Sequence, residues 1–172
     1  IKAVLVIYVA RVLGAEGYGI FSYAVGLASF FAIFSDLGVN GFLMREVAKG
    51  DKEFSAHFSA TFVAKLALIA LTTVLILGIA PFISRIEGAG TLLWLAALLI
   101  ALDSLRDFFV HVMRAEEKME RETAVVIATN LAITLFGLAA LLMHASPKAL
   151  LVGYTAGSGI GAFAAFLAVR RY

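Results

Sequence analysis

The chain has 172 residues, of which 62% are hydrophobic and 15% are charged, and its formal net charge at pH 7 is +2. Soluble domains are about 45–50% apolar and about 25% charged, so a soluble fold could not bury this much apolar surface, and lipid must be its solvent. The small net charge gives no indication of a nucleic-acid partner, and the absence of cysteine excludes disulfides, cysteine-ligated metals and thiol catalysis.

Six apolar segments, separated by glycine, proline or charged residues, predict an all-α integral membrane protein with six transmembrane helices. In chain order, the predicted spans cover residues 1–13, 18–44, 54–80, 91–114, 124–143 and 148–169. The first segment is short for a bilayer crossing, which takes about 20 residues. It also lacks the basic start and the small-residue cleavage site of a signal peptide. We therefore expect it to be the remainder of a longer helix.

Glycine, proline and charge mark the predicted turns. Gly14, Gly17 and Gly19 follow the first span closely, and this density of glycine predicts a tight turn. The third span is expected to stop at Pro81, because proline lacks the amide donor that a helix needs. The charged stretch 114–123 predicts a short helical hairpin that continues the fourth and fifth helices above the membrane.

Polar residues recur at helical spacing inside the apolar segments: Asp36 and Asn40, Thr61 and Lys65, Asp103, Arg106 and Asp107, and Asn130 and Thr134. A charged side chain at mid-membrane costs roughly 2.5–3.5 kcal/mol, so such residues face the bundle interior or a water-filled path. One interpretation is a hydrated central cavity in which Lys65 and Arg106 hold an anionic group such as a diphosphate. The other is that Asp36 pairs with Lys65, and Asp103 with Arg106, only to hold the helices together.

The fourth span carries the highest density of charge. Asp103, Asp107 and His111 fall on one stripe at 3.6 residues per turn, with Arg106 and Arg114 beside it. Three charges facing lipid would cost on the order of 8–10 kcal/mol, so the stripe must face other helices, a wet cavity or the headgroups. Asp103 and Asp107 have the spacing of an acid–base pair, but Arg106 between them favours a neutralised cluster. The sequence shows no catalytic constellation and no metal-ligand spacing, and we predict that the protein is not an enzyme.

The sixth span is expected to make close helix contacts. Gly153, Gly157 and Gly161 form two overlapping small-xxx-small motifs, which in membrane helices are typical of a packing face. The loop before this span predicts the start of the helix, because Ser146 can act as a cap and Pro147 can occupy the first turn.

The distribution of positive charge predicts the orientation in the membrane. Nine of the 14 Lys and Arg residues fall on one side of the six spans: Lys2, Arg45, Lys49, Lys52, Arg114, Lys118, Arg121, Arg170 and Arg171. Three fall on the other side, Arg11, Arg85 and Lys148, and Lys65 and Arg106 lie within the spans. The positive-inside rule places the richer side, with both ends of the chain, in the cytoplasm. Arg11, Arg45 and Arg114 end their spans, and we interpret them as membrane-edge anchors or gate residues.

Several short motifs carry a resemblance to a known family. Arg11, Leu13 and Gly14 are followed by Gly17-Tyr18-Gly19, then by Asp36-Leu37-Gly38 and by Arg45-Glu46, and RAEEKME follows the fourth span. In this order and spacing, the sequence resembles the polysaccharide-biosynthesis flippases of the Wzx type. These belong to the multidrug/oligosaccharidyl-lipid/polysaccharide exporter superfamily.

The resemblance implies a fold and a function. Family members are built from two six-helix lobes arranged as a V around a central cavity, and this chain resembles the amino-terminal lobe without its carboxy-terminal partner lobe. They move lipid-linked oligosaccharides, usually on a polyprenyl diphosphate, from the cytoplasmic to the outer leaflet by alternating access. The implied partners are the bilayer of the cell membrane and a polyprenyl-diphosphate-linked glycan. No cofactor is implied, and coupling to a proton or sodium gradient stays open.

The candidate cavity residues are Asp36, Asn40, Lys65, Asp103, Arg106, Asp107 and Asn130. Two other functions are compatible with the same residues. The carboxylates would also suit a cation-coupled multidrug exporter of the same superfamily, because a drug/proton exchanger needs a titratable acid in its path. A non-transporting membrane scaffold would use the glycine face of the sixth span but would leave the polar residues unexplained.

Overall fold

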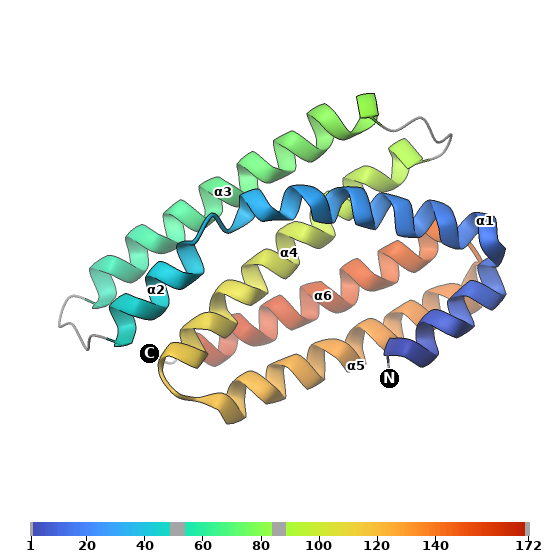
Figure 1. Ribbon diagram of the computed structural model, residues 1–172. Helices are drawn as coiled ribbons and strands as arrows, with labels where there is room; N and C mark the ends of the chain where they lie inside the picture. The colour runs from blue at the N-terminus through green and yellow to red at the C-terminus, as the bar shows by residue number, and fades with distance from the viewer. Residues whose placement is uncertain (1, 49–53, 84–88, 171–172) are drawn as a thin grey trace.

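The computed structural model describes residues 2–48, 54–83 and 89–170 (Figure 1). Six α-helices and one short 3₁₀-helix make up this part of the chain: α1 (Lys2–Phe31), η1 (Ala32–Ser35), α2 (Val39–Ala48), α3 (Phe54–Ile83), α4 (Ala89–Ala115), α5 (Met119–Met143) and α6 (Pro147–Val169). The described residues form no strand. Lys49, Lys52, Arg85 and Arg171, which entered the orientation prediction, lie outside the described residues.

Four stretches of helix are long and apolar enough to cross a membrane: Val6–Ser35, Phe58–Ile83, Met119–Met143 and Pro147–Val169. Helix α4, with four charged residues in its second half, is not among them. The protein is therefore an all-α, multi-pass membrane protein, as its composition predicted.

The predicted turn after the first span is confirmed, and it is made by one residue. Gly14 has φ 69° and ψ 178° and divides α1 into two helical arms (Figure 1). Glycine populates this region without the steric cost that a Cβ atom would add. Gly17 and Gly19 do not extend the turn, because the second arm is already helical where they lie.

The predicted continuous helix over 18–44 is interrupted. Its axis runs through η1 and then breaks at Leu37 and Gly38, whose φ values are 39° and 86°, before α2 begins. The Asp36 carboxylate accepts a hydrogen bond from the Asn40 amide at 3.2 Å, so it supplies a partner to one of the free donors at the start of α2. Asp36 therefore acts at a helix end, where an aspartate is favoured, and not in the middle of a continuous helix.

Other helix ends differ from prediction by small amounts. Helix α3 runs through Pro81 to Ile83, because a proline in the last turn removes only one intrahelical donor.

Helix α4 ends in the turn 116–118, after which α5 begins at Met119, so the predicted charged hairpin is present. The start of α6 is also as predicted: Ser146 Oγ accepts a hydrogen bond from the Ala149 amide at 3.1 Å, and Pro147 occupies the first turn.

Successive helices run back and forth between the two ends of the bundle (Figure 1). The end of α2, the start of α3, the turn from α4 to α5 and the end of α6 lie at one end. The turn at Gly14, the end of α3, the start of α4 and the step from α5 to α6 lie at the other. This is the alternation on which the orientation prediction depends; which end faces the cytoplasm stays a prediction.

Two apolar clusters fill the bundle, one toward each end. The first joins α1, α3, α4, α5 and α6 and includes Phe21, Ile76, Leu93 and Leu150. The second joins α2, α4, α5 and α6 and is built around Phe108. On α4, the stretch between the two clusters carries Asp103, Ser104, Arg106 and Asp107. The polar side chains between the two clusters, which we call the polar layer, are Ser35, Asp36, Asn40, Lys65, Asp103, Ser104, Arg106, Asp107 and Ser158.

The glycine face of α6 packs on α5. A Cβ atom on Gly157 would lie 2.5 Å from the backbone of Ile133, one on Gly153 would lie 2.5 Å from the Phe136 carbonyl oxygen, and one on Gly161 would overlap Thr129. Such backbone approach is possible only without side chains, which confirms the predicted packing face.

Substitution of Gly38 and of Gly41 by alanine is expected to change the free energy of unfolding in opposite directions. Gly38 has φ 86° and Gly41 lies inside α2, and at both positions an added methyl group would meet no other atom within 4 Å. We expect Gly38→Ala to lower the free energy of unfolding by about 1 kcal/mol, because an L side chain is strained at this φ. We expect Gly41→Ala to raise it by about 0.5–1 kcal/mol, because alanine favours a helix. Thermal unfolding in detergent measures both changes, and a shift of the same sign for the two variants would contradict the interpretation.

Candidate functional site

A cavity of about 410 Å³ opens between the end of η1, the start of α2, α3 and the second half of α4. Its walls combine charged and polar side chains with few apolar ones. The lining residues are Ala32, Ser35, Asp36, Asn40, Lys65, Ile100, Asp103, Ser104, Arg106, Asp107 and His111. Ligand sites in proteins commonly have volumes of roughly 300–1,000 Å³, so this cavity is large enough for a small polar group.

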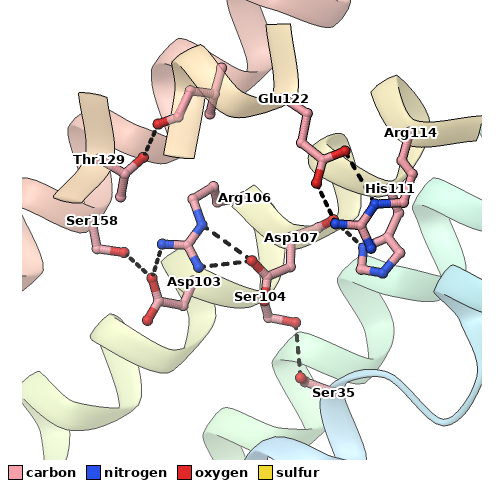
Figure 2. A network of polar contacts seen from close by, with 11 residues as sticks. Ser35, Asp103, Ser104, Arg106, Asp107, His111, Arg114, Glu122, Thr129 and Ser158 are labelled. Atoms are coloured by element: carbon pink, nitrogen blue, oxygen red, sulfur yellow. Dashed lines mark hydrogen bonds and ion pairs between the residues drawn. The ribbon is translucent and has the colours of Figure 1, made fainter. Parts of the chain in front are cut away.

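Arg106 is the centre of the polar contacts on α4 (Figure 2). Its guanidinium donates to Asp103 at 2.9 Å and to Asp107 at 2.8 and 3.2 Å, so one arginine links two carboxylates on the same helix. Ser158 on α6 is fully buried and donates to the same Asp103 oxygen at 2.5 Å. Because arginine carries its donors in a fixed plane, this arrangement holds both carboxylates in defined positions.

The 3₁₀-helix η1 is tied to α4 by hydroxyl groups. Ser104 donates to Ser35 Oγ at 2.9 Å, and Ser35 in turn donates to the Ala32 carbonyl at 2.7 Å. Both serines are buried. The contact fixes the place where the second arm of α1 breaks, and it therefore sets the position of Asp36 at the cavity.

Lys65 contributes a deeply buried cation from α3. Its side chain is only 1% exposed, and its ammonium lies 3.5 Å from Asp36 Oδ1, at the long end of hydrogen-bond range. An ammonium group has three donors, so this single long contact leaves part of its capacity for another acceptor.

Asn40 supplies a buried acceptor that has no partner. The residue is 7% exposed, and its side-chain oxygen makes no hydrogen bond within the described part of the chain. A buried acceptor without a partner costs about 1–3 kcal/mol, so a position that keeps one is a candidate contact for a ligand or a water molecule.

His111 closes the cavity one turn beyond Asp107. Its Nδ1 lies 2.7 Å from the Asp107 carbonyl oxygen. A carbonyl oxygen only accepts, so Nδ1 is the nitrogen that carries the proton and Nε2 is left for other contacts.

Comparison with known proteins identifies the family. The family described as polysaccharide biosynthesis protein matches residues 1–172, which is the whole chain. The chain belongs to this family. The resemblance carried by the glycine, Asp36-Leu37-Gly38 and Arg45-Glu46 motifs is thereby confirmed. No curated protein and no solved structure matches the chain.

Six of the seven candidate residues of this family member line the same cavity. Asp36, Asn40, Lys65, Asp103, Arg106 and Asp107 come together from three separate parts of the chain. Asn130 does not line it. It lies on α5, which packs mainly against α6, and its backbone carbonyl accepts a hydrogen bond from Thr134.

The two interpretations of the polar residues both describe part of the structure. The pairs Asp36–Lys65 and Asp103–Arg106 are present, at 3.5 and 2.9 Å. The same residues also surround a cavity. Lys65 and Arg106 are thus less available to an anionic ligand than the sequence alone indicated, because each already contacts a carboxylate.

The arginines predicted at the membrane edge lie away from the cavity. Arg11 is exposed in the first arm of α1, and Arg45 is exposed in the last turn of α2. Arg114, which ends α4, forms a two-contact ion pair with Glu122 on α5. These positions fit an anchoring role at the bundle ends.

Sequence reasoning missed three serines of the site, Ser35, Ser104 and Ser158. Short hydroxyl side chains are common in membrane helices, so they carry little signal alone. Ser158 does follow Gly157 directly, and the packing motif is the one feature that indicated a buried position there.

Proposed function

We propose that this chain is part of a flippase, a membrane transporter that translocates lipid-linked oligosaccharide or polysaccharide precursors from the cytoplasmic to the outer leaflet by alternating access. The observation that carries the proposal is the cavity in the polar layer of a protein from the polysaccharide biosynthesis family. A polar headgroup needs such a place to cross a bilayer, while its lipid tail stays among the acyl chains.

The position of the cavity supports this role. Apolar clusters lie on both sides of it along the bundle, so the cavity lies part-way along the helices and not at either end of the bundle. Ionisable residues at such depth are expensive, and they mark transport pathways in membrane proteins. Substrate sites of transporters are commonly found near the bilayer midplane between structural repeats.

A second lobe completes the proposal. In a two-lobed transporter, the cavity described here would form one wall of a central path and the carboxy-terminal lobe the other. Rocking of the lobes would expose the path to each leaflet in turn. The proposed orientation has the α2–α3 end of the bundle in the cytoplasm, since among the described residues that end carries Arg45, Arg114, Lys118, Arg121 and Arg170, and the other end carries Arg11 and Lys148.

Replacing Lys65 tests the proposal. The complete transporter is reconstituted in vesicles with a fluorescent polyprenyl-diphosphate glycan, and a membrane-impermeant sugar-cleaving enzyme reports the glycan that reaches the outer leaflet. We expect Lys65→Met to lower the translocation rate about tenfold or more, because a buried donor to the headgroup is lost. Lys148→Met is the matched control, since Lys148 is exposed at one end of the bundle.

Wild-type translocation in the Lys65 variant would contradict the assignment of the cavity. Absence of translocation by the wild-type transporter, with several glycans, would contradict the flippase itself. The exporter alternative is tested in the same vesicles: it requires efflux of a cationic dye that depends on an imposed proton or sodium gradient.

A further inference from the structure

The charges around the cavity are not arranged for an anion. Three carboxylates, Asp36, Asp103 and Asp107, line it against two cations, Lys65 and Arg106. Both cations already contact carboxylates, at 2.8–3.5 Å. A diphosphate carries negative charge and offers only acceptors, so it would have to displace these contacts and approach three carboxylates of like charge.

The unused atoms of the cavity are mainly acceptors. All contacts of the three carboxylates use one oxygen of each, Oδ1, and the Oδ2 atoms have no partner among the described residues. The side chains of Asp36, Asp103 and Asp107 are 43, 34 and 50% exposed, so these oxygens can be reached from the cavity.

The buried Asn40 oxygen points to the same kind of ligand. It is an acceptor without a partner, on a side chain more than nine-tenths buried, at the wall of the cavity. Only a group with a hydrogen-bond donor can satisfy it. A phosphate oxygen cannot do so, whereas a sugar hydroxyl can.

A sugar ring also matches the donors that remain. Lys65 makes one long contact, and the Arg106 guanidinium has five N–H groups for its three contacts. Hydroxyl groups both donate and accept, so neighbouring hydroxyls of one ring can bridge a carboxylate and a cation without adding charge. Neither an anion nor an ammonium ion would satisfy both kinds of group.

We propose that this cavity binds the hydroxyl groups of an uncharged sugar ring next to the lipid diphosphate, and that the diphosphate itself lies outside the cavity. The proposal rests on the proposed flippase function and specifies which part of the headgroup the polar layer recognises. Asn40, Asp36 and Asp107 accept from the ring hydroxyls, while Lys65 donates to them.

A binding experiment tests the proposal without requiring transport. The complete transporter in lipid nanodiscs is titrated with farnesyl diphosphate and with its derivatives that carry one hexose, N-acetylhexosamine or hexuronate. We expect a neutral sugar derivative to bind at least about tenfold more tightly than farnesyl diphosphate alone, and more tightly than the hexuronate derivative. We expect Asn40→Leu to remove most of this gain and to leave the affinity for farnesyl diphosphate unchanged.

Asn130→Leu is the matched control, because Asn130 lies on α5 outside the cavity, and it should keep the gain. Equal loss of affinity for the bare and the sugar-bearing diphosphate in Asn40→Leu would overturn the proposal, as would tighter binding of the hexuronate or no gain from any sugar. Asp107→Asn gives a second variant for the case in which Asn40→Leu does not fold; it should lower the sugar gain severalfold. Failure of the flippase proposal is read separately, from translocation by the wild-type transporter.

Discussion

Replacing Arg106 with methionine is expected to destabilise the bundle by about 2–3 kcal/mol and to abolish translocation. Arg106 is the guanidinium that contacts both Asp103 and Asp107, and its side chain is 18% exposed (Figure 2). Without it, two carboxylates four residues apart on α4 are left unpaired between apolar clusters. Breaking a fully buried pair costs about 3–5 kcal/mol, and the partial exposure of the two carboxylates reduces that value.

The charge explanation is tested by removing the carboxylates together with the arginine. A triple variant that combines Arg106→Met with Asp103→Asn and Asp107→Asn should recover most of the lost stability, because no unpaired charge remains. It should not recover translocation, since the cavity would have lost the charges of Asp103, Arg106 and Asp107 and would keep only those of Asp36 and Lys65. For each variant, thermal unfolding in detergent measures the stability and the vesicle assay measures the translocation rate.

Arg114→Met is the matched control for loss of an arginine from α4. Its ion pair with Glu122 lies at the end of the bundle, and the Arg114 side chain is 45% exposed. Such pairs contribute about 0–1 kcal/mol. If Arg106→Met were no more harmful than Arg114→Met, the polar layer would not hold the helices as described.

The charged residues of the site could be predicted from the sequence because the free-energy cost of exposing a charge to lipid decides which way they face. A charge in an apolar helix must face inward, and helical spacing then puts Asp103, Arg106 and Asp107 on one side of α4. The same reasoning placed Lys65 inside the bundle, where it is 1% exposed. Composition and periodicity are local properties, so they do not depend on knowing the neighbours of each helix.

Asn130 shows where this reasoning ends. Spacing indicates which residues share a face of one helix, but not which helix that face meets. The glycine face of α6 draws α5 against it, so that Thr129 is buried at this contact while Asn130 is turned away from the cavity. The order of helices around the bundle is a tertiary property, and the sequence of α5 alone does not contain it.

The break at Asp36 has a similar explanation. The stretch 18–44 is apolar enough to be read as one helix, and only the Asp36-Leu37-Gly38 motif departs from that pattern. Leu37 is not a glycine, yet its φ is 39°. The conformation is held by contacts from outside the segment, Ser104 on α4 and Lys65 on α3, whose positions are unknown until the bundle is assembled.

Gly157→Leu is expected to separate α5 from α6. It should lower the free energy of unfolding at least as much as Arg106→Met does. Even a methyl group at this position would lie 2.5 Å from the Ile133 backbone, which cannot move aside as a flexible side chain can. Overpacking of this kind costs about 1–3 kcal/mol for small additions, and a leucine side chain adds three more carbons. Because Ser158 is the next residue, the shift should also remove its hydrogen bond to Asp103 and so lower translocation.

Gly78→Leu on α3 is the control for the prediction at Gly157. Gly78 is exposed, and an added Cβ would meet no atom within 4 Å, so the same substitution there should change the melting temperature little. Size-exclusion profiles after heating in detergent compare the two variants directly. An equal loss in both would mean that leucine at any glycine harms the bundle. A loss confined to Gly157 would show that the close contact between α5 and α6 supports the polar layer, since the helix that carries the packing face also carries Ser158.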